Sequence, residues 1–337
     1  DGLAKSGILF DRCYSTSAVC APTRSSIITG RYASSMGTQH MRSKQPLPAG
    51  VKFFPEYLRA AGYFTTNNAK TDYNTSSSWD AAWNENNKTA HWRHRAAGQP
   101  FFAIFNFEQS HESSLHKQAA QVTDPAKVRV PAYLPDTPTV RADIAHYFDN
   151  VSRADAALGK ILADLRADGL AEDTIIFYYG DHGGAVSRSK RFLYENGTHP
   201  PLVAHFPKKF QHLAPAVPNS RLSELVNFVD LAPTVLSLAG LPLPAHLEGL
   251  SFKPVLDNPS RPWKPAAFSQ YPRPGNSATG GQPLMGYSMR TERYRFTAWL
   301  HRDDPSKVAA LELYDHQTDP QENQNLAKRT EHAALVA

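Results

Sequence analysis

The sequence predicts an α/β protein in which a mostly parallel central sheet is flanked by helices, with a small α+β subdomain at the C-terminus. Two continuous apolar runs, residues 101–107 and 174–179, are typical of strands that are buried on both faces. Between them, apolar side chains recur at helical spacing from Ile144 to Leu165, and Gly169 ends this long helix. Alternation of strand and helix favours a parallel sheet that is covered by helices.

The length of the chain indicates two units. At 337 residues it exceeds the usual size of a protein with one hydrophobic core. We expect a large α/β domain over residues 1–250 and a smaller subdomain, with a small antiparallel sheet, over residues 251–337. The second region carries proline-rich connections and a segment rich in tyrosine and arginine.

The other elements follow in chain order. They are short apolar or amphipathic segments: strands at residues 8–10, 63–66 and 202–206, and helices at residues 53–61 and 225–239. Gly62 ends the first of these helices, and Pro233 lies near the first turns of the second. The chain opens on residues 1–5 in what looks like the middle of a helix.

Composition excludes several classes of protein. The 36 basic and 31 acidic residues are scattered and mixed, so the net charge of +5 does not indicate nucleic-acid binding, although it suits an anionic substrate. Two cysteines, Cys13 and Cys20, exclude a disulfide framework and a zinc cluster, and leave one local disulfide as the alternative. No apolar run approaches the ~18 residues of a membrane span, and no signal peptide is visible.

The segment with the most specific pattern is residues 20–24, in which Cys20 is followed by Pro22 and Arg24. Proline suits the first turn of a helix, and we expect that helix to end at Gly30. A helix N-terminus favours an anion or an activated nucleophile, and Arg24 would lie one turn from Cys20. A buried cysteine at the start of a helix is the alternative.

Polar residues follow both apolar strands at the edge of the sheet where ligands usually bind. His111 comes soon after the first strand, and Asp181 and His182 come directly after the second. An Asp-His pair next to glycines is able to hold a metal ion, or else to form a hydrogen-bonded turn. Lys70 and Lys190 taken alone would be interpreted as solvated surface lysines.

Taken together, these segments resemble the type I, formylglycine-dependent sulfatases of the alkaline-phosphatase superfamily. The resemblance runs through nearly the whole chain in the family's order, at residues 20–24, 29–32, 68–73, 111, 180–183, 190–197, 229–234, 312–315 and 319–322. The first two thirds are similar to bacterial heparan-sulfatase-like enzymes, and residues 287–295 look more like iduronate-sulfate sulfatases.

The resemblance implies a sulfuric ester hydrolase. Cys20 would be oxidised to formylglycine by a formylglycine-generating enzyme, and the hydrated aldehyde would attack sulfur beside one calcium ion. Arg24 would hold the hydrate, and Lys70 and Lys190 would bind the sulfate oxygens. His111 would protonate the leaving oxygen of the sugar.

The implied metal ligands are Asp181, His182 and the group derived from Cys20. Because calcium prefers oxygen ligands, His182 facing the substrate is the alternative. Relatives also begin with a strand that ends in two aspartates, and this chain starts after that point. We therefore expect an exposed edge or a gap in the sheet, and we keep the alternative of an inactive, truncated sulfatase that only binds glycan.

Substrate contacts are expected at three residues. Asp72 stands where many relatives have a histidine, and it would accept a hydrogen bond from a sugar hydroxyl or orient Lys70. His40 and Arg42 would contact a carboxylate or a second sulfate, or else lie on a surface loop. The expected substrate is a sulfated oligosaccharide or polysaccharide fragment that contains uronic acid, and such an enzyme would act in the periplasm or outside the cell. A phosphoester or phosphonate hydrolase of the same superfamily is the alternative.

Overall fold

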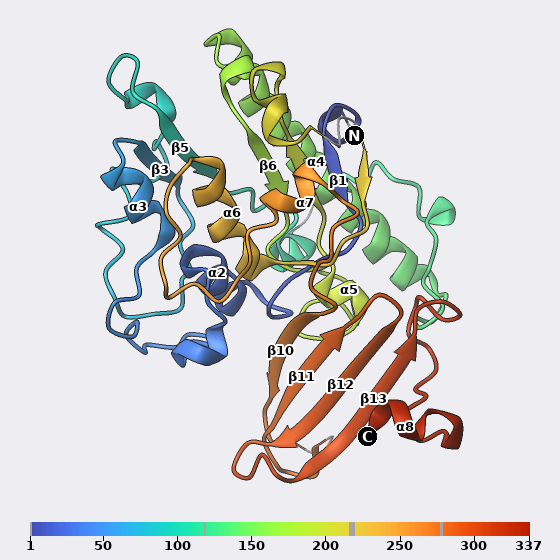
Figure 1. Cartoon of the computed structure of the whole chain (residues 1–337). Coiled ribbons are helices and arrows are strands. Elements are labelled where there is room, and N and C mark those ends of the chain that lie inside the picture. Colours follow the sequence, from blue (N-terminus) through green and yellow to red (C-terminus); the bar gives the residue numbers. More distant parts are fainter. Residues whose placement is uncertain (1, 118, 216–219, 277–278) are drawn as a thin grey trace.

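The protein consists of an α/β part and a C-terminal antiparallel sheet (Figure 1). The structure, a computed structural model, describes residues 2–117, 119–215, 220–276 and 279–337. A one-turn helix, α1 (Gly2–Lys5), begins the described chain, as the sequence predicts; Asp1 of that prediction lies outside the described residues. None of the described helices is both long enough and apolar enough to cross a bilayer.

The α/β part contains two main sheets. The first has the order β6 (Ile176–Tyr179), β7 (Leu202–His205), β1 (Ile8–Phe10) and β8 (Arg221–Leu222). The second has the order β4 (Glu85–Asn86), β3 (Phe64–Asn68) and β5 (Phe101–Phe105). A two-residue pair, β2 (Cys13–Tyr14) with β9 (Val226–Asn227), lies beside them.

The predicted α/β class is confirmed, but the first sheet is mixed. β3 pairs in parallel with both β4 and β5, whereas β7 is antiparallel to both β1 and β6. A parallel pair needs a crossover connection, which is usually a helix. The connection between β6 and β7 instead contains only the one-turn helix α5 (Glu195–Thr198), and it returns the chain in the opposite direction.

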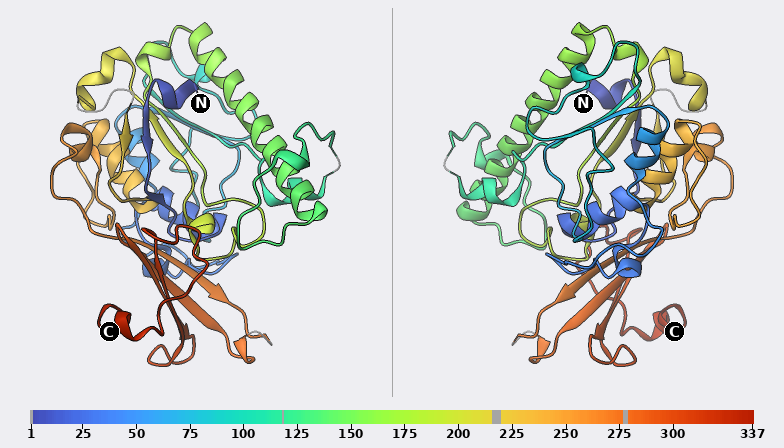
Figure 2. Two further views of the ribbon diagram at one scale, coloured as in Figure 1. Left: turned by 90° about the vertical axis from the view of Figure 1, so that its right-hand side faces the viewer. Right: turned by 90° about the vertical axis from the view of Figure 1, so that its left-hand side faces the viewer.

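A gap separates the two sheets, as expected from the sequence. β5 and β6 each pair on one side only, and no backbone pairing joins them within the described part of the chain. A cavity of about 810 Å³ lies between them, lined by both strands and by apolar side chains of the long helix α4 (Pro138–Ala167), which runs alongside (Figure 2). The prediction that β5 and β6 are buried on both faces is therefore wrong: all their residues are half-buried, because each has an unpaired edge at the cavity.

The remaining helices pack against the sheets. They are α2 (Cys20–Thr29), which ends at Gly30 in the left-handed conformation as predicted, α3 (Phe54–Ala60), α6 (Leu231–Leu238) and α7 (Lys253–Asp257). The prediction of one helix over residues 225–239 is wrong at its N-terminal end, where Val226 and Asn227 form β9. Pro233 explains the later start, because proline is favoured in the first turn of a helix.

The C-terminal sheet is an antiparallel meander of β10 (Ala267–Arg273), β11 (Leu284–Arg290), β12 (Tyr294–His301) and β13 (Val308–Asp315), followed by α8 (Ala333–Val336). One face packs on the α/β part at Gly286, where an added Cβ would lie 2.6 Å from Trp299 and 2.7 Å from Leu193. Only glycine allows the loop at Leu193 to approach this strand so closely. Phe252 and Leu256 still belong to the core of the first sheet, so the antiparallel sheet itself begins at Ala267.

Candidate active site

Cys20 is the first residue of α2, and the turn that leads into it is closed by Thr23. The Thr23 hydroxyl donates to the carbonyl oxygen of Ser17 at 2.7 Å and accepts from the N–H of Ser17 at 3.2 Å. Cys20 and Cys13 are both free thiols, so the alternative of a local disulfide is wrong. Burial raises the pKa of the Cys20 thiol, with Asp181 adding to the effect, so the thiol itself is not an activated nucleophile.

Arg24 joins α2 to the ends of both sheets. Its guanidinium donates to the carbonyl oxygens of Lys70 at 2.7 Å and Thr71 at 2.8 Å, and to Asn106 Oδ1 at 2.7 Å. Its Nη1 lies 3.7 Å from Asp181 Oδ2. Arg24 therefore fixes the loop that carries Lys70, and it does so through the backbone.

Lys190 meets His111 across the site. Lys190 is 7% exposed, and its Nζ lies 3.3 Å from His111 Nε2 and 3.2 Å from Glu112 Oε2. Glu112 also accepts both Nη groups of Arg191, at 2.5 Å and 2.8 Å, and these hydrogen bonds lower its pKa to about 2. Glu112 is thus ionised near neutral pH and holds two cations in place.

A hydrogen-bond donor lies beside each ring nitrogen of His111. Its Nδ1 lies 2.9 Å from Ser113 Oγ, and its Nε2 faces the Lys190 ammonium group, which only donates. The backbone N–H of Ser113 also donates to Nδ1 at 3.3 Å, so a donor lies beside each ring nitrogen and these contacts are compatible with either neutral tautomer. Burial lowers the pKa of His111, and the positive charges of Lys190 and Lys70 lower it further.

Replacing Lys190 by methionine is expected to raise the pKa of His111, because the variant lacks the nearer ammonium group that opposes protonation. The pKa should remain below 6.5, since the burial that lowers it persists. An NMR titration of the imidazole carbon resonances measures the shift. His91, whose pKa is lowered by burial and by Arg93, is the internal control and should not move. An unchanged pKa for His111 would contradict the contact with Lys190.

Asp181 and His182 lie at the carboxyl end of β6. Burial raises the pKa of the Asp181 carboxyl, but His182, Arg24 and Lys70 outweigh burial, and the net shift is downward. Burial lowers the pKa of His182, whose Nδ1 donates to the carbonyl oxygen of Gly183 at 2.8 Å. The free lone pair is then on His182 Nε2, which lies 3.7 Å from Asp181 Oδ1.

These two side chains offer a carboxylate and an imidazole nitrogen to one cation. A calcium ion takes 6–8 oxygen ligands, so Asp181 and His182 fit one part of its shell and do not complete it. Cys20 is close enough for the charge of Asp181 to raise the pKa of its thiol. Among the described residues, however, only Glu195, His316 and Glu322 place three such ligand atoms within 4.8 Å of one another, so Cys20, Asp181 and His182 do not converge this closely.

Most of the predicted site residues converge, and two do not. Asp72, with a φ of 55°, and Lys70 both influence the Cys20 thiol electrostatically. His40 instead faces the C-terminal sheet, with its Nε2 3.4 Å from Arg302 Nη2, and Arg42 is exposed.

Three residues of the site were missed by sequence reasoning. Asn106 donates to Asn67 Oδ1 at 2.9 Å besides accepting from Arg24, and Glu112 and Arg191 support Lys190 and His111 as described above. A signal existed for Asn106, which is the polar residue within the apolar run 101–107. No comparable signal marks Glu112, because its partners are far away in the sequence.

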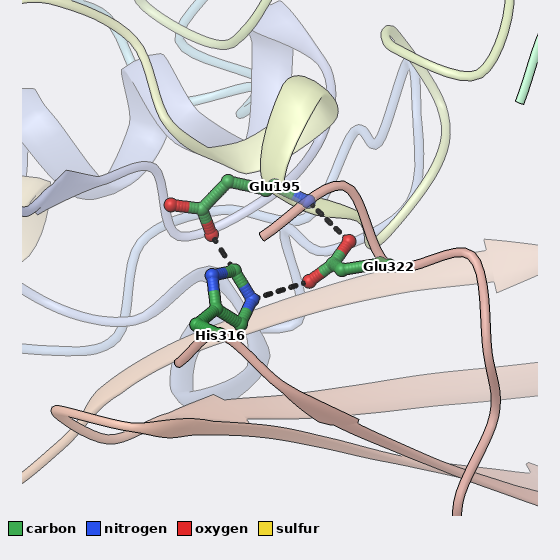
Figure 3. A group of neighbouring side chains, drawn as sticks. All are labelled: Glu195, His316 and Glu322. Atoms are coloured by element: carbon green, nitrogen blue, oxygen red, sulfur yellow. Dashed lines mark hydrogen bonds and ion pairs between the residues drawn. The ribbon is translucent and has the colours of Figure 1, made fainter. Parts of the chain in front are cut away.

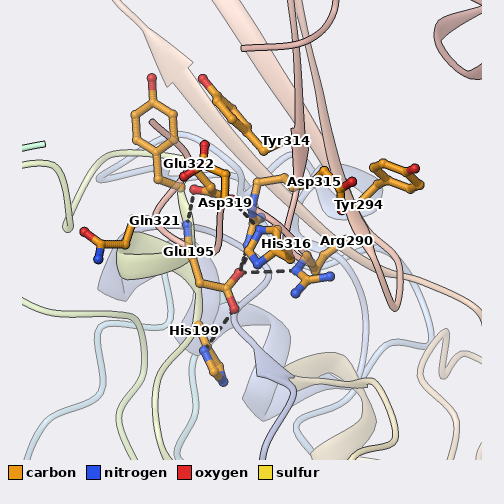
Figure 4. A network of polar contacts seen from close by, with 12 residues as sticks. Glu195, His199, Arg290, Tyr294, Tyr314, Asp315, His316, Asp319, Gln321 and Glu322 are labelled. Atoms are coloured by element: carbon orange, nitrogen blue, oxygen red, sulfur yellow. Dashed lines mark hydrogen bonds and ion pairs between the residues drawn. The ribbon is translucent and has the colours of Figure 1, made fainter. Parts of the chain in front are cut away.

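A buried ion-pair network holds the segment that carries Lys190 against the C-terminal sheet (Figure 4). Glu322 accepts the backbone N–H of Glu195 at 2.7 Å and Arg295 Nε at 2.6 Å. Arg295 also donates to Glu195 Oε2 at 2.5 Å, and both Arg295 and Glu322 are 1% exposed. On the other side of Lys190, Arg188 donates to the carbonyl oxygens of Gln321 and Glu322. The network therefore positions the lysine from both sides.

Glu195, His316 and Glu322 lie close enough together to suggest a second metal site (Figure 3). Their oxygen atoms are already engaged, however, because Arg295 binds both carboxylates and Arg290 Nε lies 3.3 Å from Glu195 Oε2. Two guanidinium groups balance two carboxylates, and a cation would have to displace them. This cluster is an ion-pair network.

Comparison with known proteins identifies the family. Residues 1–241 match the family described as Sulfatase. The chain belongs to the sulfatase family. Residues 180–337 also match the C-terminal region of the N-sulphoglucosamine sulphohydrolases. The resemblance to sulfatases inferred from the sequence is therefore confirmed.

Several relatives with curated names extend this result. An ulvan-active sulfatase of Formosa agariphila is 36% identical over 80% of this sulfatase, and the match spans about half (52%) of that relative's own length. The N-sulphoglucosamine sulphohydrolase of Homo sapiens is 25% identical over 100% of this chain and 82% of its own. The iduronate 2-sulfatase of Mus musculus is 24% identical over 100% of this chain and 87% of its own.

Solved structures confirm the fold. A protein of Bacteroides thetaiotaomicron, described in work on its metabolism of glycosaminoglycans, superposes with a TM-score of 0.78 at 16% identity, covering 100% of this sulfatase and 86% of that chain. A phosphonate monoester hydrolase from Silicibacter pomeroyi superposes with a TM-score of 0.73 at 21% identity, covering 99% and 87%. At these identities the likeness extends to the fold alone.

Proposed function

We propose that this sulfatase removes sulfate from a sulfated carbohydrate that contains uronic acid. The observation that carries the proposal is the convergence of Lys70 and Lys190 on the buried Cys20, with Arg24 on the same helix. Two cations beside one reacting group, with a third on the same helix, suit an anionic ester. Relatives named for ulvan, sulphoglucosamine and iduronate support a carbohydrate substrate.

Each residue has a proposed role in the reaction. Lys70 and Lys190 bind the sulfate oxygens as point charges. His111 donates a proton from Nε2 to the leaving sugar oxygen, and its lowered pKa is expected to rise when the negative charge of a sulfate is bound nearby. Asp72 accepts a hydrogen bond from a sugar hydroxyl, and His40 and Arg42 contact acidic groups further along the substrate.

The nucleophile is proposed to be formylglycine, which supplies an aldehyde hydrate at the position of Cys20. Arg24 lies on the same helix and holds that hydrate in place. Conversion requires a formylglycine-generating enzyme as a maturation partner. Because Cys20, Pro22 and Thr23 are all buried in the folded protein, the segment has to be presented to that enzyme before α2 packs.

Calcium is the proposed metal, held in part by Asp181 and His182, and when bound it would stabilise negative charge on the nucleophile. Replacing Asp181 by asparagine is expected to weaken calcium binding at least about tenfold, because the anionic ligand is lost. Isothermal titration calorimetry with calcium chloride measures this without any substrate. Asp304→Asn, which removes a carboxylate from an exposed pair with Lys307, is the matched control. Equal calcium affinity in the Asp181→Asn variant and the unsubstituted chain would overturn this ligand assignment.

The proposed function is tested by sulfate release. The chain is co-expressed with a formylglycine-generating enzyme, the aldehyde at Cys20 is verified by peptide mass, and a panel of sulfated oligosaccharides is assayed with calcium and with a chelator. Calcium-dependent release of sulfate is the expected result. Release of phosphate from phosphoesters or phosphonates instead would favour the alternative hydrolase, and binding without release from an aldehyde-bearing chain would favour a glycan-binding protein.

A further inference from the structure

Arg273 lies at the end of β10 among aromatic rings. Its guanidinium carbon is 4.3 Å from the ring centre of Phe192, 5.4 Å from that of Trp299 and 5.7 Å from that of Tyr271. Burial lowers the pKa of this guanidinium. Stacking on aromatic faces holds an arginine in one orientation and leaves its N–H groups free for a ligand.

The position of Arg273 follows from the way β10 meets the turn before α2. Ser17 and Gln270 form a parallel bridge, and the N–H of Gln270 donates to the carbonyl oxygen of Thr16 at 2.9 Å. Beyond the bridge, Cys20 shares one hydrophobic cluster with Tyr271 and Trp299, two of the rings beneath Arg273.

The acids around Arg273 are engaged elsewhere. Glu312 accepts from Trp299 Nε1 at 2.6 Å and from the Tyr314 hydroxyl at 2.8 Å. Glu112, which influences the neighbouring Tyr271, is bound to Arg191 and Lys190. Among the described residues, no carboxylate lies within ion-pair distance of Arg273. A partly desolvated guanidinium without an internal counter-ion is suited to an external anion.

We infer that Arg273 binds an anionic substituent of the substrate, a carboxylate or a second sulfate, on the sugar whose scissile sulfate lies at Cys20. The inference rests on the proposed function and names a residue that sets its specificity. The rings of Phe192, Tyr271 and Trp299 fix the direction of the guanidinium, which binds either anion in a bidentate manner. Arg273 then selects acidic sugars, whereas Lys70 and Lys190 hold the sulfate that is removed.

The test measures binding, so that it does not depend on turnover. The full chain with Cys20→Ala is titrated calorimetrically with a monosulfated disaccharide that contains uronic acid, with its carboxyl-reduced analogue, and with a disulfated form of that analogue. In the parent, which is the chain with Cys20→Ala alone, the acidic disaccharide should bind about 10- to 100-fold more tightly than the carboxyl-reduced one. This is the gain in affinity expected from a charge-assisted hydrogen bond. Adding Arg273→Gln should bring this ratio close to 1. Retention of tight binding by the disulfated analogue would identify a second sulfate as an equivalent ligand.

Two further variants make the result decisive. Arg273→Lys keeps the positive charge but loses the planar guanidinium group with its paired N–H donors, and it should give an intermediate ratio of affinities. Arg329→Gln removes one positive charge from an exposed site just before α8, at the other end of the subdomain, and should preserve the ratio (Figure 1). An unchanged ratio in Arg273→Gln, or equally weak binding of every probe to the parent, would overturn the inference. Failure of the proposed function would appear separately, as absence of sulfate release from the aldehyde-bearing chain.

Discussion

Replacing Cys20 by alanine is expected to abolish sulfate release, with a loss of roughly 10⁴-fold or more, because the variant lacks the precursor of the nucleophile. The remaining cations would still bind sulfate, so affinity for a sulfated ligand should change much less than turnover. Steady-state assays of sulfate release, paired with calorimetric binding of the same substrate, measure both quantities. Unchanged release in the variant would contradict the proposed chemistry.

Cys13→Ala is the matched control for this experiment. Cys13 is the second free thiol of the chain, is fully buried in β2, and has a pKa that is raised by burial. It packs in the core of the first sheet and touches none of the residues assigned to the reaction. The control variant should therefore retain sulfate release, even if its unfolding midpoint falls.

Glu322→Gln is expected to lower the free energy of unfolding by about 3 kcal/mol, because it leaves the buried Arg295 guanidinium with a weaker counter-charge. The same change loosens the contact between Glu322 and the N–H of Glu195, so Lys190 should be held less firmly. We expect the KM for a sulfated substrate to rise by about tenfold, since a Lys190 that is held less firmly would form a weaker ion pair with the sulfate. Urea unfolding and steady-state kinetics measure the two effects.

The control and the pH dependence sharpen this prediction. Lys307→Gln breaks an exposed pair with Asp304 in the turn between β12 and β13 and should change the free energy of unfolding by less than about 0.5 kcal/mol. Burial raises the pKa of Glu322 and of Glu195, but Arg295 and their histidine partners more than offset it, so both folded values lie below the unfolded one of about 4.3. The stabilisation is therefore complete above that pH and is lost as the pH falls through the folded values. A Glu322→Gln protein as stable as the unsubstituted chain would contradict the network's role.

Local patterns predicted the parts of the site that lie close together in the sequence. Cys20, Pro22 and Gly30 marked α2 and its ends, because capping depends on neighbouring residues. Asp181 was predicted from its place at the end of an apolar strand. The proximity of Lys70 to Lys190 came only from the resemblance to a family, since lysine alone carries no signal of burial or of partners.

Long-range partners could not be read from the sequence. Arg295, Glu195 and Glu322 come from three distant segments, and nothing in the local pattern of any one of them distinguishes a buried charge from an exposed one. Asn106 was included in the apolar run 101–107, and its partner Arg24 comes from a distant segment. The antiparallel direction of β7 was missed for the same reason, because the loop before it has no helical periodicity to reveal its path.

Because no backbone pairing joins β5 to β6 in the described part of the chain, we expect the active site to lie between two units that open separately. Lys70 and His111 follow the strands of one sheet, whereas Asp181 and Lys190 follow a strand of the other. The two sheets have separate hydrophobic clusters, which meet at Val235 of α6. Local opening of either unit would then separate the two lysines, and amide hydrogen exchange should resolve two sets of protection factors. An anion bound between Lys70 and Lys190 would link these units, so occupancy of the site should raise protection in both sheets together.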